Sequence, residues 1–239
     1  MRETNSVQSR GSTTNLLLVT FHFPPIQASS GVHPSLGLAR YLPREGVETN
    51  ILRVAPFVYE HSDQENLSLL TSSIHVIRAP ALDAIRHLSI AGYYFAAMAR
   101  PDRWISWYPG AVLSGWIELK RRPAVILSTY PIATAHLIGW TLHRLTGLPW
   151  VADLRDPMAQ EDYPTDQKVW RWFSRIEDLA ARCASRLVFT APSAVDYYRR
   201  RFPELSQEKL VLIENGYDES LFKELENTEH KQAGKGPLI

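Results

Sequence analysis

The 239-residue sequence is long enough for one large α/β domain, or for one domain with part of a second. Its hydrophobic fraction of 45% and charged fraction of 21% are those of a globular protein and exclude a largely disordered chain. The formal net charge of +1 argues against nucleic acid as a partner. The single cysteine, Cys183, excludes an intramolecular disulfide and a multi-cysteine metal site, which fits a reducing, cytoplasmic location.

Two segments are candidates for a membrane-targeting or membrane-spanning sequence, and neither has the required pattern. Residues 1–14 are polar and lack the apolar core of a secretory signal, so we expect a disordered tail there. The most apolar later segment, Leu88–Met98, is shorter than the ~20 residues that a membrane-spanning helix needs. The sequence therefore predicts no transmembrane helix.

Short apolar runs alternate with segments of helical periodicity along the chain. Runs that are apolar on both faces suit a parallel sheet covered by helices. The predicted strands are Leu16–Phe21, Thr49–Val54, Ile74–Ile77, Ala124–Leu127, Pro149–Ala152, Leu187–Phe189 and Leu210–Ile213. The predicted helices are Val32–Tyr41, Ala111–Leu119, Ile132–Leu145, Asp166–Ala184 and Asp196–Phe202, with a further helix before Ala111. This order predicts an α/β fold with a doubly wound, mostly parallel, Rossmann-like sheet.

The connection after the first predicted strand is longer than a simple turn requires. It contains neither the G-x-G-x-x-G of dinucleotide-binding folds nor a P-loop, which argues against hydride and phosphoryl transfer. What remains is Gly31, preceded by Ser29 and Ser30, at the start of a helix. A helix N-terminus can hold a phosphate, and a residue without Cβ would let the backbone come close. Taken alone, the stretch is better explained by a helix cap and a turn.

Polar residues are also expected where other strands end. Asp153, Arg155 and Asp156 follow the strand Pro149–Ala152, and open α/β sheets bind ligands at the carboxyl ends of their strands. Arg155 could bind a diphosphate or an acceptor through two parallel hydrogen bonds, or form an internal ion pair with a neighbouring aspartate. Asp153 is a candidate general base. Tyr130 could stack on a sugar or nucleotide, or be an ordinary half-buried tyrosine.

The histidines near the first strand, His22 and His33, have unequal surroundings that do not make a metal site, so we expect no metal. Aromatic and basic residues gather between Arg86 and Arg122. These residues are Trp104, Trp107, Tyr108, Trp116, Arg100, Arg103, Lys120, Arg121 and Arg122. They suit an anionic membrane surface, and they suit somewhat better a pair of amphipathic helices that cover the sheet.

Several stretches carry a family resemblance. They are LLLVTFHFPP with ASSGVHPSLGLARYLPREGVETNIL, AVILSTYPIATAHLIGWTLHRLTGLPWVADLRDP, and RIEDLAARCASRLVFTAPSAVDYYRRRFP with KLVLIENGYDESLF. Together they resemble the N-terminal domain of retaining GT-B glycosyltransferases of the family 4 type, over about Leu16–Phe222. The closing Asn-Gly-aromatic-Asp followed by Phe is the most specific part, because it marks where that family's first domain hands over to its second.

The resemblance implies a two-domain enzyme whose C-terminal domain binds most of a nucleotide-sugar donor and whose N-terminal domain binds the acceptor. Residues 15–222 would be the acceptor-binding half, and residues 223–239 a linker with the start of a missing donor-binding domain. The chain alone would be inactive. The acceptor would be a sugar or a lipid-linked sugar, used in cell-surface polysaccharide or glycolipid synthesis at the inner face of the membrane. No cofactor is implied beyond the nucleotide-sugar co-substrate.

The resemblance also places residues. In that family the glycine-containing loop after the first strand approaches the donor phosphates. The expected cleft residues are Ser29, Ser30, Gly31, His33, Tyr130 and Asn215, and the expected catalytic residues are Arg155, Asp153 and Asp156. Some relatives carry a catalytically important histidine near the position of Arg155, and that role cannot be carried over here. The alternative is a non-catalytic, Rossmann-like module that binds a nucleotide or a partner protein.

Overall fold

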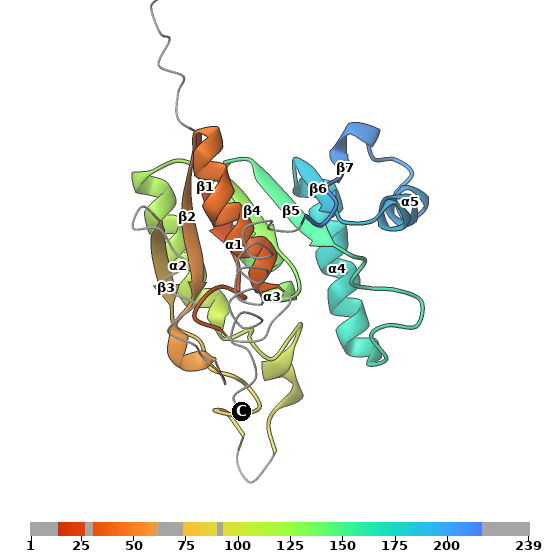
Figure 1. The fold of residues 1–239 in the computed structure, drawn as a ribbon. Helices are drawn as coiled ribbons and strands as arrows, with labels where there is room; N and C mark the ends of the chain where they lie inside the picture. The colour runs from red at the N-terminus through yellow and green to blue at the C-terminus, as the bar shows by residue number, and fades with distance from the viewer. Residues whose placement is uncertain (1–13, 27–30, 60, 62–73, 90–92, 217–239) are drawn as a thin grey trace, which may run out of the picture.

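The computed structural model describes residues 14–26, 31–59, 61, 74–89 and 93–216. Its centre is a seven-stranded sheet in the order β3-β2-β1-β4-β5-β6-β7, with every neighbouring pair parallel (Figure 1). The strands are β1 (Thr14–Val19), β2 (Val47–Val54), β3 (His75–Ala79), β4 (Val125–Thr129), β5 (Trp150–Arg155), β6 (Arg186–Phe189) and β7 (Leu210–Leu212). The predicted parallel, Rossmann-like sheet is therefore confirmed.

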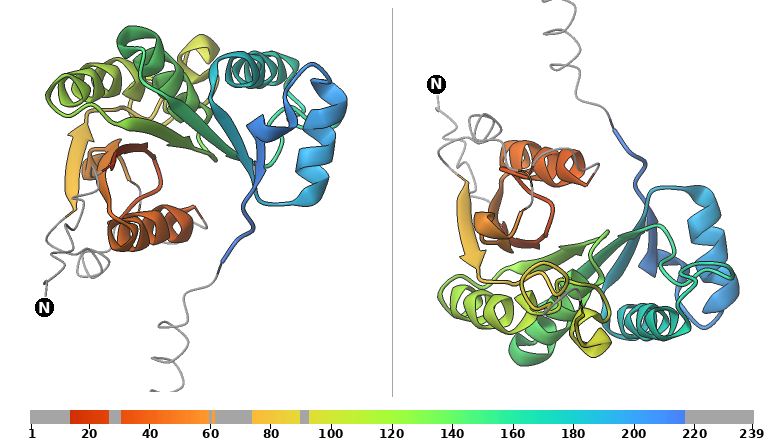
Figure 2. Two further views of the ribbon diagram at one scale, coloured as in Figure 1. Left: turned by 90° about the horizontal axis from the view of Figure 1, so that it is seen from above. Right: turned by 90° about the horizontal axis from the view of Figure 1, so that it is seen from below.

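Helices cover both faces of this sheet. They are α1 (Val32–Tyr41), α2 (Trp107–Arg121), α3 (Ala133–Thr146), α4 (Gln167–Cys183) and α5 (Pro192–Arg201). Figure 2 shows α1 on one face and α2, α3 and α4 on the other, as a doubly wound fold requires. None of the helices in the described part of the chain combines the length and the apolar character that crossing a bilayer demands.

The expected pair of helices between β3 and β4 is wrong. The described residues ahead of α2 form turns and one short 3-10 helix, Ala96–Ala99, and Pro101 disfavours a helical conformation at the residue before it. Asp102 instead caps α3, because its carboxylate accepts hydrogen bonds from the Thr134 amide at 2.8 Å and hydroxyl at 2.9 Å. Trp104 and Trp107 are buried, so most of their indole surface cannot contact a membrane.

The core on the α2–α3–α4 side is close-packed around a buried polar chain. The indole nitrogen of Trp150 donates to the Ser128 hydroxyl at 2.8 Å, and the same hydroxyl lies 2.9 Å from Nδ1 of His136. All three side chains are fully buried. Gly139 of α3 lies directly against them, since a Cβ there would stand 2.7 Å from the Trp150 nitrogen and 2.9 Å from Cβ of Ser128.

Replacement by alanine should therefore have opposite effects on stability at two helical glycines. Gly139→Ala should lower the free energy of unfolding by about 1 kcal/mol, because overpacking outweighs the better helix propensity of alanine. Gly37→Ala in α1 should raise it by about 0.5–1 kcal/mol, because nothing lies within 4 Å of the added methyl group. Urea unfolding of both variants measures the two changes, and an equal sign for both would contradict the packing argument.

Candidate functional site

The carboxyl ends of the parallel strands share one edge of the sheet, the lower edge in Figure 1. The chain order reverses between β1 and β4, and open α/β sheets bind ligands outside the strands at such a switch point. His22 and Gly31 follow β1, Tyr130 follows β4, and Arg155 ends β5. We therefore treat this edge, called the carboxyl edge below, as the candidate site.

Gly31 is the N-cap residue of α1, with an ordinary φ of −72°, and it is buried. Its neighbour is His22, since a Cβ on Gly31 would stand 2.6 Å from Nδ1 of that ring. The missing side chain therefore makes room for His22, and an approach of this glycine to a phosphate stays a prediction. Ser29 and Ser30 lie outside the described residues. His33 is exposed in the first turn of α1.

The contact between Gly31 and His22 gives a direct test. Gly31→Ala should lower the free energy of unfolding by about 1 kcal/mol, because the methyl group must displace the ring. In a His22→Ala background the same substitution should be nearly neutral, because the space is then free. A double-mutant cycle by urea unfolding measures the difference, and additive effects would mean that the strain arises elsewhere.

Arg155 has a backbone conformation that side chains rarely adopt. Its φ is +61°, and within the described part of the chain no other non-glycine residue has a positive φ. The Asp156 amide donates to the Leu154 carbonyl at 2.7 Å, so Arg155 is the central residue of a tight, strained three-residue turn. The register between β5 and β6 shifts at the same place. Strain of this kind gathers at functional sites, which makes Arg155 the leading candidate of the carboxyl edge.

The guanidinium of Arg155 has few partners. Its Nη2 lies 3.5 Å from Oδ1 of Asn215, at the limit of a hydrogen bond. None of the ion pairs among the described residues includes this guanidinium, but its charge acts to lower the pKa of Asp153, so a longer-range interaction with that aspartate exists. Burial and the positive charge of Arg155 lower the pKa of His22 to about 4, so this ring is neutral at pH 7.

The remaining predicted residues have contrasting environments. Asp153 accepts a hydrogen bond from the Thr129 hydroxyl at 2.7 Å, and burial raises its pKa. A carboxyl with a raised pKa suits a general base, although Thr129 already occupies one of its oxygens. Tyr130 is half-buried, and burial together with nearby negative groups raises its pKa to about 12. Asp156 and Asn215 are exposed.

A cavity of about 240 Å³ lies at the end of β1. It is lined by Phe21, His22, Ile26, Tyr59, His61, Arg103 and Trp104. The rings of Phe21 and Trp104 lie 4.6 Å apart, and the Arg103 guanidinium covers the Trp104 ring at 4.6 Å. The Phe21 and Trp104 rings are buried, so the groups of this cavity that can bind a sugar are the guanidinium and the two histidines, through hydrogen bonds. No cluster of three or more metal-binding side chains occurs among the residues that the structure describes.

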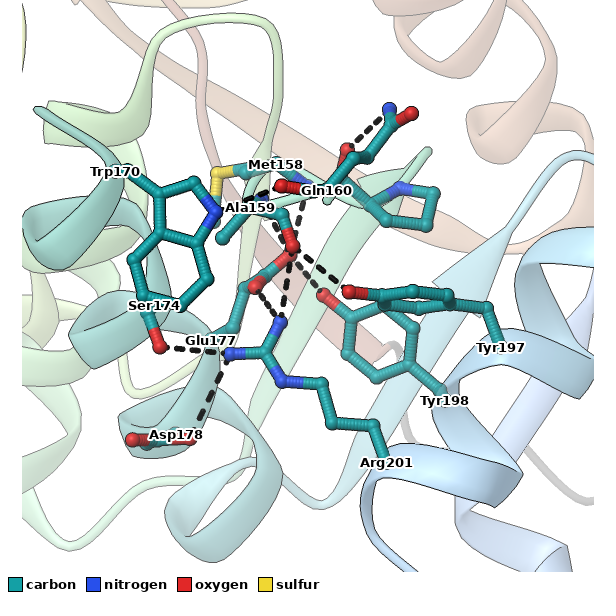
Figure 3. A network of polar contacts seen from close by, with 11 residues as sticks. Met158, Ala159, Gln160, Trp170, Ser174, Glu177, Asp178, Tyr197, Tyr198 and Arg201 are labelled. Atoms are coloured by element: carbon teal, nitrogen blue, oxygen red, sulfur yellow. Dashed lines mark hydrogen bonds and ion pairs between the residues drawn. The ribbon is translucent and has the colours of Figure 1, made fainter. Parts of the chain in front are cut away.

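The sequence did not identify His22 as a site residue, although its place after the first strand was a usable signal. It also missed the polar network around Glu177 behind the β5 end, shown in Figure 3. The sequence feature that could have revealed this network is Glu177 itself. It lies on the apolar face of the helix predicted over Asp166–Ala184, one residue after Ile176 and four after Phe173.

Comparison with known proteins adds a family. A family model described as a glycosyl transferase 4-like domain matches residues 31–216. None of the curated proteins matches this sequence.

Solved structures give the fold. A sucrose-phosphate synthase domain from Thermosynechococcus elongatus is similar with a TM-score of 0.52 and 15% identity, over 92% of this chain and 99% of that one. HepE from Anabaena, in complex with UDP and glucose, has a TM-score of 0.53 and 15% identity, over 87% and 45% of the two chains. UGT2 from Phytolacca americana, with UDP-2fluoro-glucose and pterostilbene, has a TM-score of 0.54 and 10% identity, over 86% and 54%. The chain thus spans about half the length of HepE and UGT2.

Proposed function

Because this chain belongs to the glycosyl transferase 4-like domain family, we propose that it is the acceptor-side half of a retaining glycosyltransferase that uses a nucleotide-sugar. The donor would be a UDP-sugar, because HepE, a protein of the same fold, forms complexes with UDP-glucose and with UDP and glucose. A second α/β domain would bind most of that donor, and the reaction would take place at the carboxyl edge. The chain alone would not transfer sugar.

The observation that carries this proposal is the position and strain of Arg155. A guanidinium at the end of β5, with no carboxylate within ion-pair distance among the described residues, would offer two parallel donors to a departing diphosphate. Its contact with Asn215 lies in the segment that follows β7, on the side from which the chain would continue to the second domain. The substrate-binding surface at the carboxyl edge would also include Asp153, Asp156 and Tyr130. The loop around Gly31 would approach the donor phosphates.

The acceptor would bind in the aromatic cavity at the end of β1. His22 and His61, which line this cavity, would hydrogen-bond a sugar, and Arg103 would bind an anionic group of a lipid-linked acceptor. Arg103 is itself held by Asp83, whose carboxylate lies 3.1 Å from Nη2. We propose that such an acceptor belongs to cell-surface polysaccharide or glycolipid synthesis.

A turnover screen tests this function. Nucleotide-sugar hydrolysis and transfer would be measured for the 239-residue chain and for the product of the complete gene, read to its natural stop codon. We expect turnover from the complete product and none from the chain alone. Nucleotide binding without turnover in both preparations, and no separate partner domain encoded nearby, would instead support a non-catalytic binding module.

The membrane partner of the proposal rests on exposed aromatic residues. Tyr93 and Phe95 are 83% and 81% exposed, beyond the carboxyl edge, between Arg86 and Arg100. Because such residues insert at the interface of anionic bilayers, the chain should sediment with vesicles that contain anionic lipid and less with neutral ones. Replacing Tyr93 and Phe95 by serine should reduce the bound fraction several-fold. Leu145→Ser, at the opposite end of the molecule and 55% exposed, is the matched control, and equal binding by all variants would exclude this contact.

A further inference from the structure

The segment after Arg155 is held by side chains of α4 and α5 (Figure 3). Oε1 of Glu177 accepts hydrogen bonds from the amides of Met158 at 2.6 Å and Ala159 at 3.3 Å. The Tyr197 hydroxyl donates to the Ala159 carbonyl at 2.8 Å. The Trp170 indole nitrogen donates to the Gln160 carbonyl at 2.7 Å. We call this set of contacts to residues 158–160 the loop anchor.

The centre of the loop anchor is a buried charge. The Glu177 side chain is fully buried, its Oε1 also accepts from the Tyr198 hydroxyl at 2.6 Å, and its Oε2 pairs with Arg201. Arg201 in turn donates to the Ser174 hydroxyl at 2.8 Å. Burying a carboxylate is costly unless every oxygen is paired, and here the pairing groups include two backbone amides of one short loop. An apolar residue would have filled the same space without fixing those amides.

The loop anchor lies close to the strained residue of the carboxyl edge. On one side the Arg155 carbonyl accepts from the Thr190 amide at 3.0 Å and hydroxyl at 3.3 Å. On the other side, three residues later, Glu177 holds the Met158 amide. A positive φ at a residue with a side chain persists only where its surroundings fix it from both directions. These two attachments satisfy that condition.

We propose that Glu177 and Tyr197 are positioning residues that keep Arg155 in its positive-φ conformation, with the guanidinium at the carboxyl edge beside His22 and Asn215. Neither residue touches that edge. They act through the peptide groups of Met158 and Ala159. The consequence for sugar transfer rests on the proposed function, whereas the effect on the position of Arg155 does not.

The test uses His22 as a local probe of Arg155 in the 239-residue chain. Because the positive charge of Arg155 helps to lower the pKa of His22, moving that charge away raises the pKa. The His22 titration would be followed by NMR in Arg155→Gln, Tyr197→Phe and Glu177→Gln. We expect an upward shift in all three, no larger in the two anchor variants than in Arg155→Gln. Tyr197→Phe combined with Arg155→Gln should shift the pKa no further than Arg155→Gln alone.

The matched control is Tyr108→Phe. Tyr108 is also half-buried and also makes one hydroxyl contact, 2.7 Å to Thr141, but it joins α2 to α3. Its loss should leave the His22 titration unchanged. An unchanged His22 pKa in Tyr197→Phe, or an equal shift in Tyr108→Phe, would overturn the proposal, even if Glu177→Gln failed to fold. Lack of turnover by the complete gene product would contradict the proposed function alone, because this titration requires no catalysis.

Discussion

Arg155→Ala and Arg155→Gly are both expected to slow nucleotide-sugar turnover by the complete gene product by ~100-fold or more. Each removes the guanidinium that would stabilise the departing diphosphate, and the loss of one such donor from a site of developing charge has an effect of about this size. Arg155→Lys should recover only part of the rate, because an ammonium keeps the charge and lacks the planar fork. Initial rates at saturating and subsaturating donor measure the effect.

The same pair of variants separates function from strain. Alanine at this position is strained by the φ of +61°, whereas glycine adopts it readily. The free energy of unfolding should therefore be about 1 kcal/mol higher for Arg155→Gly than for Arg155→Ala. Equal turnover of all Arg155 variants would remove this residue from the reaction, and equal stability of the alanine and glycine variants would show that the turn is not strained.

The sequence predicted the parallel sheet and the residues at its carboxyl edge for one physical reason. Strands buried on both faces read as continuous apolar runs, and parallel strands bring all their carboxyl ends to one edge. Tyr130 and Arg155 could therefore be placed there from their position after a run. The prediction of a further helix before Ala111 was wrong, because the aromatic residues of that segment, among them Trp104, pack into the core from turns.

What escaped prediction depends on contacts between distant residues. Glu177 binds Met158, 19 residues earlier, and Arg201, 24 residues later, and no local period encodes either contact. The positive φ of Arg155 carries no signal either, because the residue that normally marks such a turn is glycine. Gly31 was predicted to let the backbone approach a phosphate, which stays a prediction, and its contact with His22 of the same chain was not foreseen.

His136 should make the protein sensitive to acid. The ring is fully buried, its Nδ1 lies 2.9 Å from the Ser128 hydroxyl, and its Nε2 has no hydrogen-bond partner among the described residues. Burial lowers the pKa of His136 to about 3, so the ring stays neutral in the folded protein at moderate pH. In the unfolded chain a histidine titrates at a pKa of about 6.5.

The direction in which stability changes with pH follows from these two pKa values. Above pH 6.5 the histidine is neutral in both states, and its contribution to stability does not change. As the pH falls below 6.5, only the unfolded chain binds the proton, so folding loses about 1.4 kcal/mol per pH unit down to a pH of about 3. Between pH 7 and pH 4.5 the loss from His136 amounts to about 2–3 kcal/mol. Asp102 and Asp153, whose pKa values burial raises, act in the opposite direction, so the His136 contribution must be measured by difference.

His136→Leu isolates the pH-dependent contribution of His136 to stability, because leucine fills the buried site and cannot bind a proton. Urea unfolding at pH 7, 5.5 and 4.5 should show the difference in unfolding free energy between the unaltered protein and His136→Leu shifting by about 2–3 kcal/mol in favour of the variant. Ile138→Val, fully buried in the same helix, is the control, because its loss of packing should be the same at each pH. A difference that stayed constant for His136→Leu as well would mean that the folded protein protonates this ring, which would require α3 to open and admit water to Nε2.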